Sequence, residues 1–209
     1  MNRLPGFVRQ HLAALRGLLV FTVITGIIYP VAMWGLAQGL FHHQANGSLV
    51  SYKGRTIGSS LLCQEFVDAK GNPLPQYFQP RPSAATSGAS NDYGCNPLFS
   101  AASNLGPSNP KLIALIRQRQ AAIAKFDHVP VSQIPPDAVT ASGSGLDPDI
   151  SPAYAAIQVD RVAAARHISA AQVRALVSQN TTSRSIGILG QPAVNVLTLN
   201  IALDNKYPV

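Results

Sequence analysis

The chain has 209 residues, of which 46% are hydrophobic and only 12% are charged, and its formal net charge is +7. The charges are scattered, with no run of five or six like signs, so the clustered basic surface of a nucleic-acid-binding protein is excluded and no nucleic-acid partner is expected. The sequence contains no G-x-x-x-x-G-K-[ST] loop and no CxxC pair, which excludes a P-loop and a CxxC redox or zinc motif.

Residues 18–40 form an apolar stretch without a single charged residue or histidine. A helix of 23 residues is about 35 Å long, enough to cross a hydrocarbon core of about 30 Å. Because Pro30 lacks a backbone donor, we expect the helix to be kinked or loosened near its middle. Tyr29, Trp34 and Phe41 suit the boundary between membrane and water near the end of the span.

The flanking charges predict the orientation of this helix. Arg3, Arg9 and Arg16 precede it and the first acidic residue is Glu65, so the positive-inside rule leaves the N-terminal tail in the cytoplasm. We therefore predict a cytoplasmic tail over residues 1–17, a transmembrane helix over 18–41 and an exported domain over 42–209. A cleaved signal peptide is the alternative, but its apolar core is usually shorter and an Ala-x-Ala-like site is poorly placed here.

The exported domain contains 168 residues, enough for one compact core, and carries 13 basic and nine acidic residues for a net charge of +4. Both cysteines, Cys63 and Cys95, fall within it. A disulfide between them would close a loop of about 33 residues and is compatible with export. Two free, buried thiols are the alternative, and the sequence leaves both open.

The first part of the domain reads as strands followed by a long irregular segment. Strand-like residues 48–52 and 59–66 flank turn signals at 53–55 and at Gly58. Residues 68–109 are rich in Pro, Gly, Ser and Asn, and such a length without periodicity is typical of a functional or disordered segment. Its aromatic residues need burial, so we expect an ordered surface excursion that contacts a partner.

Three helices are predicted next. The first begins after Asn109-Pro110 and stops at Pro130, the second begins after Ser151 and ends near Arg166, and the third runs from Ser169 to about Asn180. Ser169 and Gln172 form a capping-box pattern at the start of the third helix. The alternating residues 193–203 predict a half-buried closing strand. Strands, then helices, then a strand indicate an α+β fold.

Residues 140–152 hold the densest signal for a site, yet they match no catalytic template. Ser144 is not in a G-x-S-x-G elbow, and Gly145 is not followed by the third glycine of a dinucleotide fingerprint. Asp147 and Asp149 alternate as metal ligands do, but the other ligands of an EF-hand loop are missing. We interpret the glycines as turn residues and Asp147 as a partner of the local backbone, and we predict no metal site.

Two other classes of function are alternatives for this sequence. A membrane-anchored exported hydrolase would use Ser144 with His128 or His167 and Asp147, but no nucleophile elbow supports it. An anchored solute-binding domain would bind potassium without partners.

Five motifs in order resemble the C subunit of the Kdp potassium-transporting ATPase, over nearly the whole chain. They follow the single N-terminal span and occupy residues 58–64 (GSSLLCQ), 77–84 (YFQPRPSA), 103–110 (SNLGPSNP), 142–148 (SGSGLDP) and the C-terminal run from 150 to 200 (ISP, QV, RVA, VNVL, LN). Departures are small: Cys63 and Ala101-Ala102 stand where glycines are usual in the family.

The resemblance implies an accessory subunit without catalysis of its own, in a bacterial inner-membrane complex that imports potassium with ATP and Mg²⁺. Its partners would be a channel-like potassium-translocating subunit and a P-type ATPase subunit. The family is also described as a catalytic chaperone that raises ATP affinity, with Gln64 likened to a nucleotide-contacting glutamine. We expect no cofactor on this chain, since an exported domain cannot touch cytoplasmic ATP. The candidate partner contacts are Gln64, Tyr77, Phe78, Arg81, Pro82, Ser103, Asn104, Ser144, Gly145, Asp147 and Asn195.

Overall fold

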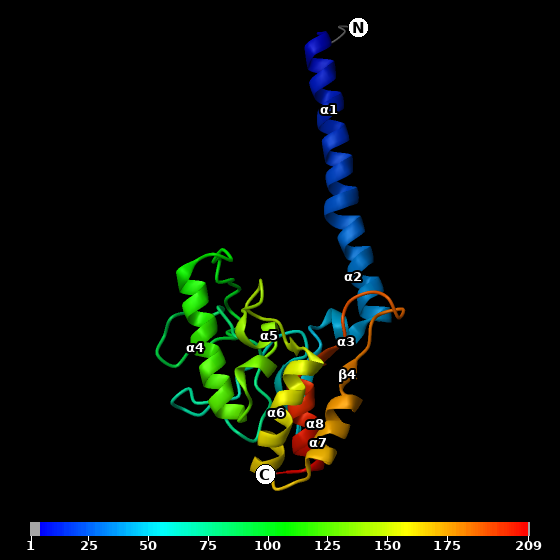
Figure 1. Ribbon diagram of the computed structural model, residues 1–209. Coiled ribbons are helices and arrows are strands. Elements are labelled where there is room, and N and C mark those ends of the chain that lie inside the picture. Colours follow the sequence, from blue (N-terminus) through cyan, green and yellow to red (C-terminus); the bar gives the residue numbers. More distant parts are fainter. Residues whose placement is uncertain (1–4, 209) are drawn as a thin grey trace. The chain divides into compact units, whose positions relative to one another are not determined.

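The computed structural model describes residues 5–208 and divides the chain into two compact units, residues 1–48 and 49–209. Together they give one long apolar helix followed by a mixed domain of helices and strands, so the predicted α+β fold is confirmed (Figure 1).

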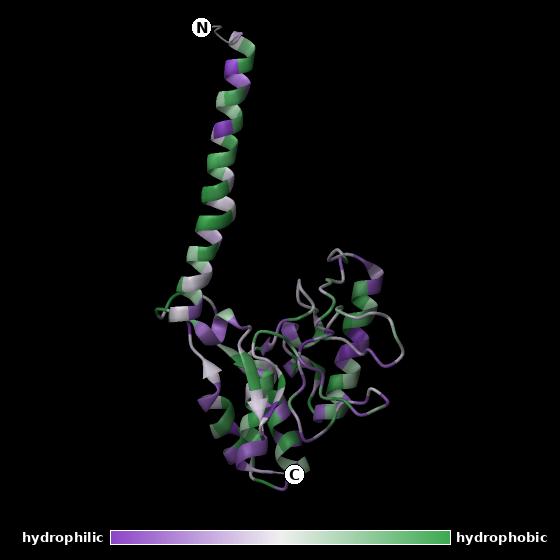
Figure 2. Cartoon of the chain, turned by 180° about the vertical axis from the view of Figure 1, so that it is seen from behind, coloured by the Kyte–Doolittle hydropathy of each residue, from purple (hydrophilic) through white to green (hydrophobic). Residues whose placement is uncertain are grey.

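The first unit is dominated by a continuous helix. It consists of α1 (Gly6–Val23), a π-helical turn η1 (Ile24–Ile28) and α2 (Tyr29–Leu40). It is long and apolar enough to cross a membrane, and hydrophobic residues predominate along it (Figure 2). None of its residues is buried. The helix begins well before the apolar stretch, so Arg9 and Arg16 lie on it, while Arg3 lies outside the described residues.

The expected loosening near Pro30 is confirmed. The π-helical turn lies directly before Tyr29 and Pro30. Proline offers no N–H to the preceding turn and its ring crowds the carbonyl four residues earlier, so the helix widens there. A short helix, α3 (His42–Ala45), follows α2, and Asn46 donates from Nδ2 to the Gln38 side chain at 3.1 Å.

The second unit opens with an antiparallel hairpin of β1 (Leu49–Tyr52) and β2 (Arg55–Ser59). The prediction of the first strand is confirmed, but the second strand was placed wrongly at 59–66. Lys53 and Gly54 both have positive φ angles (49° and 77°), so two residues suffice to reverse the chain and β2 begins at once. Residues 60–109, all of them described, contain no further helix or strand beyond an isolated bridge between Val67 and Pro73.

The three predicted helices are confirmed. The N-caps of α4 (Pro110–Asp127), α6 (Pro152–Ala165) and α7 (Ala170–Gln179) are Asn109, Ser151 and Ser169, and the capping box of Ser169 with Gln172 is complete. The helices contact one another in the order α4, α6, α7 and α8 (Val196–Lys206), with α6 between α4 and α7 (Figure 1). Short elements complete this part of the chain: η2 (Val131–Gln133), α5 (Pro136–Val139), β3 (Asp149–Ile150) and β4 (Thr181–Thr182).

The predicted closing strand over 193–203 is wrong for most of its length. Only β5 (Ala193–Asn195) is a strand, pairing with both β3 and β4, and α8 (Val196–Lys206) follows immediately. Asn195 caps this helix, because its side chain accepts from the Thr198 N–H at 3.1 Å. Val196, Leu199 and Leu203 recur at helical spacing and are all buried. Leu199 and Leu203 also belong to the alternating pattern, so the run fits a helix as well as a strand.

One hydrophobic core occupies the second unit. It combines side chains of α6, α7, α8 and β5 with Phe78 from the irregular segment, which is fully buried. The aromatic residue thus anchors an excursion that otherwise has no regular structure. This confirms that the excursion is ordered around Phe78.

Candidate functional site

Two arginines form hydrogen bonds with the backbone of residues 75–77. Arg161 lies within α6, and Arg166 is the C-cap residue of the same helix. Arg161 donates from Nη1 to the Pro75 and Tyr77 carbonyls at 2.6 and 2.9 Å, and from Nε to the Asp127 carboxylate at 2.7 Å. Arg166 donates to the Gln76 carbonyl at 2.7 Å. The carbonyls of all three residues are therefore bound by guanidinium groups.

Two buried amides continue this pattern. Asn200 of α8 accepts from the Phe78 N–H and donates to the Phe78 carbonyl, both at 2.9 Å. Gln158 of α6 accepts from the Gln79 N–H at 2.7 Å and donates to the Gln79 carbonyl at 3.2 Å. The two side chains replace a neighbouring strand, and this pairing makes burial of Phe78 possible.

Beyond this segment, Arg81 contacts the loop formed by residues 142–148. Its Nη1 lies 2.8 Å from Oδ2 of Asp147, and the other carboxylate oxygen accepts from the Asp149 N–H at 3.0 Å. Asp147 thus bonds the local backbone, as the turn interpretation predicts, and it also pairs with Arg81, which the sequence did not indicate. Burial and the neighbouring Asp147 charge raise the pKa of Asp149. No group of three or more potential metal ligands occurs among the described residues.

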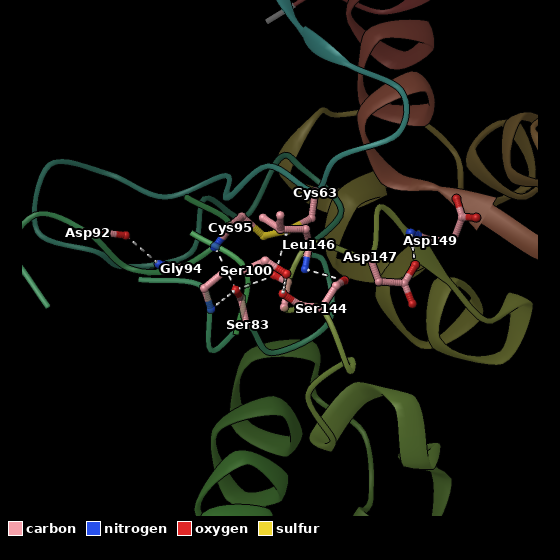
Figure 3. Close-up of a disulfide and its surroundings, with 12 residues drawn as sticks. Cys63, Ser83, Asp92, Gly94, Cys95, Ser100, Ser144, Leu146, Asp147 and Asp149 are labelled. Atoms are coloured by element: carbon pink, nitrogen blue, oxygen red, sulfur yellow. Dashed lines mark hydrogen bonds between the residues drawn. A yellow bond between two sulfur atoms is a disulfide. The ribbon is translucent and has the colours of Figure 1, made fainter. Parts of the chain in front are cut away.

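Cys63 and Cys95 form a disulfide beside this loop (Figure 3). The loop accepts hydrogen bonds from three separate segments through its carbonyls. Cys63 N–H donates to Leu146 at 3.0 Å, Ala101 N–H donates to Ser144 at 2.9 Å, and the Ser83 hydroxyl donates to Gly145 at 2.6 Å. The irregular segment before α4 is therefore fastened to residues 142–148 at several points.

Gly145 lies at the centre of this arrangement. Its φ angle is +72°, and a Cβ there would lie 2.5 Å from the Ala101 carbonyl oxygen and 2.8 Å from the Ala85 nitrogen. Both the backbone conformation and the lack of space require glycine.

The hydrolase alternative requires the Ser144 hydroxyl to meet His128 or His167. The Ser144 hydroxyl accepts from the Leu146 N–H at 3.0 Å, and Asp147 is paired with Arg81. Across residues 5–208, no hydrogen bond joins Ser144 to His128 or His167, each of which has a positive φ angle at the end of a helix.

The remaining candidate residues are dispersed over the domain. The Asn195 amide donates to the Ser60 carbonyl at 2.8 Å, and the Tyr77 hydroxyl donates to Asp204 at 3.1 Å. Ser103 and Asn104 are exposed in the segment before α4. Gln64 is half-buried and its amide oxygen lies close to Gly58. The structure thus brings Arg81, Ser144, Gly145 and Asp147 together and leaves these others apart.

A pocket of about 380 Å³ opens next to Arg81. Its wall is largely apolar, with Pro82, Phe126 and Tyr154 among its residues, and the polar side chains are Glu65, Gln79, Arg81, Arg119 and Asp127. Burial raises the pKa of Glu65 to about 7 and lowers that of Arg119. Arg119 donates to the Val139 carbonyl at 2.8 Å. Gln64 is not part of this wall as far as the structure describes it.

Sequence reasoning missed Glu65 and did not assign the roles of Gln158, Arg161, Arg166 and Asn200. Gln158 and Arg161 lie three residues apart, in line with the buried stripe of α6, and this position within an apolar helix face was the available signal. Glu65 carried no such signal, because its surroundings come from distant segments.

These features define a protein whose α+β domain follows a helix long and apolar enough to cross a membrane, and whose family-motif side chains mostly hold its own loops. The family model of the K⁺-transporting ATPase, c chain, matches residues 11–205, and the chain therefore belongs to the KdpC family.

Curated relatives agree with this assignment, and each is named potassium-transporting ATPase KdpC subunit. The relative from Gemmatimonas aurantiaca is 51% identical over 200 residues, which cover 94% of this chain and 93% of the relative. That from Mycobacterium tuberculosis is 49% identical over 197 residues (94% and 98%). That from Beijerinckia indica is 44% identical over 201 residues (96% of each).

Proposed function

We propose that this chain is a non-catalytic accessory subunit of a potassium-transporting ATPase, which holds its C-terminal domain outside the membrane. There the domain binds the outer mouth of the channel-like subunit and supports assembly with the P-type ATPase subunit. Family membership and the relatives' names support the complex. ATP and Mg²⁺ act on the ATPase subunit, and any effect of this chain on ATP affinity is transmitted through the complex.

The observation that carries the outward orientation is the disulfide. Cys63 and Cys95 pair within the domain that follows the apolar helix. Disulfides persist in oxidising compartments and are rare in the cytosol, so the bond supports an exported domain. The arginines before the helix support the same orientation.

The use of the motif side chains supports the non-catalytic role. Arg81, Ser83 and Asp147 are engaged in holding the segment before α4 onto residues 142–148. These hydrogen bonds fix the conformation of an irregular surface before a partner binds. Such preorganisation lowers the entropic cost of docking.

The first experiment is a pull-down of the tagged full chain from detergent-solubilised membranes, followed by a potassium-stimulated ATPase assay of the eluate. Recovery of a channel-like subunit and a P-type ATPase, with activity lost when this chain is omitted, is the expected result. A chain that elutes alone would overturn the accessory role.

The orientation is tested separately with single cysteines in a Cys63→Ser, Cys95→Ser background. Ser178→Cys places a thiol on the exposed surface of α7, and Gln10→Cys places a matched exposed thiol near the start of α1. In intact spheroplasts an impermeant maleimide should label only the Ser178→Cys chain, while Gln10→Cys reacts after permeabilisation. The reverse pattern would place the domain in the cytoplasm.

A further inference from the structure

The connection between β4 and β5 ends in an apolar tip. Residues 183–192 are exposed throughout, and within them Ile186, Ile188 and Leu189 are 86%, 75% and 58% exposed. Three large aliphatic side chains within four residues leave a concentrated apolar surface at the end of a hairpin connection. Such clusters on exposed loops mark interaction sites.

The backbone of this tip is closed on itself. Ser185 and Leu189 exchange two N–H···O hydrogen bonds, both 2.9 Å long, and the Gly187 and Ile188 N–H groups donate to Arg184 and Ser185 at 3.1 and 3.3 Å. Inserting a loop into an apolar medium is costly when its backbone polar groups lack partners. Here several of those groups are already paired, so moving the tip from water into an apolar medium costs less free energy.

The tip also contains a backbone conformation that is energetically unfavourable. Ile186 has a φ angle of +54°, which is unfavourable for a β-branched residue, and its side chain gains no burial in return. Strained backbone with exposed apolar side chains is typical of functional loops.

The base of the loop lies at the end of the domain where the chain enters it. Leu49, the first residue of β1, pairs with Ser59, and the next carbonyl, that of Ser60, accepts from Asn195 of β5. The loop joins β5 at its first residue, Ala193. Along the chain, only residues 41–48 lie between the end of α2 and this entry point.

The charges of the tip itself are compatible with lipid headgroups, whereas the carboxylates Asp137, Asp147 and Asp149 lie at the base of the loop, beside residues 191–193. No acidic residue occurs between Asp160 and Asp204, and Arg184 lies at the edge of the tip. An exposed guanidinium group next to aliphatic side chains matches the interfacial layer, where phosphates lie above the acyl chains.

We propose that residues 186–189 insert into the interfacial layer of the same bilayer that the N-terminal helix crosses, as a second, peripheral membrane contact of the domain. The aliphatic side chains enter the acyl boundary and Arg184 binds lipid phosphate. The contact fixes the domain against the membrane surface. It requires only that the domain lies beside the bilayer, so it does not rest on the proposed outward orientation.

The test uses the full chain with a relocated fluorophore. Trp34 is the single tryptophan, so Trp34→Phe gives a silent background in which Ile188→Trp reports on the tip. Leu98→Trp is the matched control, because Leu98 is 86% exposed and lies in the irregular segment before α4. The proteins are reconstituted into phosphatidylcholine–phosphatidylglycerol vesicles with and without brominated acyl chains, and circular dichroism confirms that each variant is folded.

Insertion predicts that the emission of Ile188→Trp shifts to shorter wavelength and is quenched by brominated lipid, whereas that of Leu98→Trp is not. Adding Ile186→Ser and Leu189→Ser to the Ile188→Trp chain should reduce both effects. Equal quenching at the two positions, or none at position 188, would overturn the proposal. A blue shift at position 188 that occurs without lipid quenching and only with the other subunits would assign the tip to a protein partner instead. Co-purification with those subunits is scored separately, so failure here leaves the accessory role untouched.

Discussion

The guanidinium of Arg81 lies 2.8 Å from the carboxylate of Asp147 and so connects two family motifs that are 66 residues apart. Both side chains are partly exposed, at 23% and 31%. The pair fastens the segment before α4 to the loop at 142–148, and its contribution should be measurable although solvent screens it.

We expect a coupling of roughly 1 kcal/mol between the two residues in a double-mutant cycle of Arg81→Gln and Asp147→Asn. An asparagine at position 147 still offers an acceptor for the Asp149 N–H. The cycle therefore removes the charge pair and leaves the hydrogen bond of the turn in place. Urea unfolding of the full chain in detergent provides the free energies. The pair of Arg174 and Asp160, 3.2 Å apart and 62% and 78% exposed, is the control and should show almost no coupling.

Replacing Asn200 should destabilise the domain much more. Asn200 is 1% exposed and makes both hydrogen bonds to the Phe78 backbone. Asn200→Ala leaves a buried N–H and a buried carbonyl without partners, at roughly 1–3 kcal/mol each. The same unfolding assay should show this loss, while Asn91→Ala, at an exposed position, should change little. Equal stabilities of the two variants would contradict the role of the amide.

Gly145→Ala should be strongly destabilising because of two separate effects. The left-handed backbone conformation disfavours alanine, and the new Cβ would clash with the Ala101 and Ala85 backbone. We expect a loss of roughly 2–4 kcal/mol. Gly88→Ala shares the positive φ angle of +80° but has open space, and should lose only about 1 kcal/mol. Gly143→Ala, with neither constraint, should be nearly neutral; a neutral Gly145→Ala would be inconsistent with the close approach.

Sequence predictions were correct where the structure is determined by residues that are close together in the sequence. Helix starts at Asn109, Ser151 and Ser169 were predictable because a cap and the residues that follow it are local. The run after Asn195 was misread, since its apolar residues satisfy both a strand and a helix period and the cap decides between them.

The site was less predictable than the fold for the same reason. Whether Cys63 meets Cys95, and whether Asn200 reaches Phe78, depends on contacts between segments that are far apart in the chain. Arg81 and Asp147 could each be selected as candidates, but nothing in the sequence indicates that they pair. Burial of Glu65 likewise depends on pocket residues from distant parts of the chain, so the sequence does not reveal it.

Glu65 should make the domain less stable as the pH rises. Burial raises its pKa from 4.5 to about 7. Below pH 4.5 both folded and unfolded chains hold the proton, so there is no penalty. Between 4.5 and 7 the unfolded chain loses its proton first, and the free energy of unfolding falls by a contribution that remains lost above pH 7.

Glu65→Gln removes this contribution and should therefore stabilise the domain by roughly 1–3 kcal/mol at about pH 8, with little effect at about pH 4. Unfolding curves of both proteins at several pH values measure the difference. Asp68→Asn is the control of opposite sign, because hydrogen bonds from Asn72 lower the pKa of Asp68 and favour its charged form. That variant should lose stability at the higher pH. A Glu65→Gln effect independent of pH would show that packing, and not ionisation, sets the role of Glu65 in the pocket.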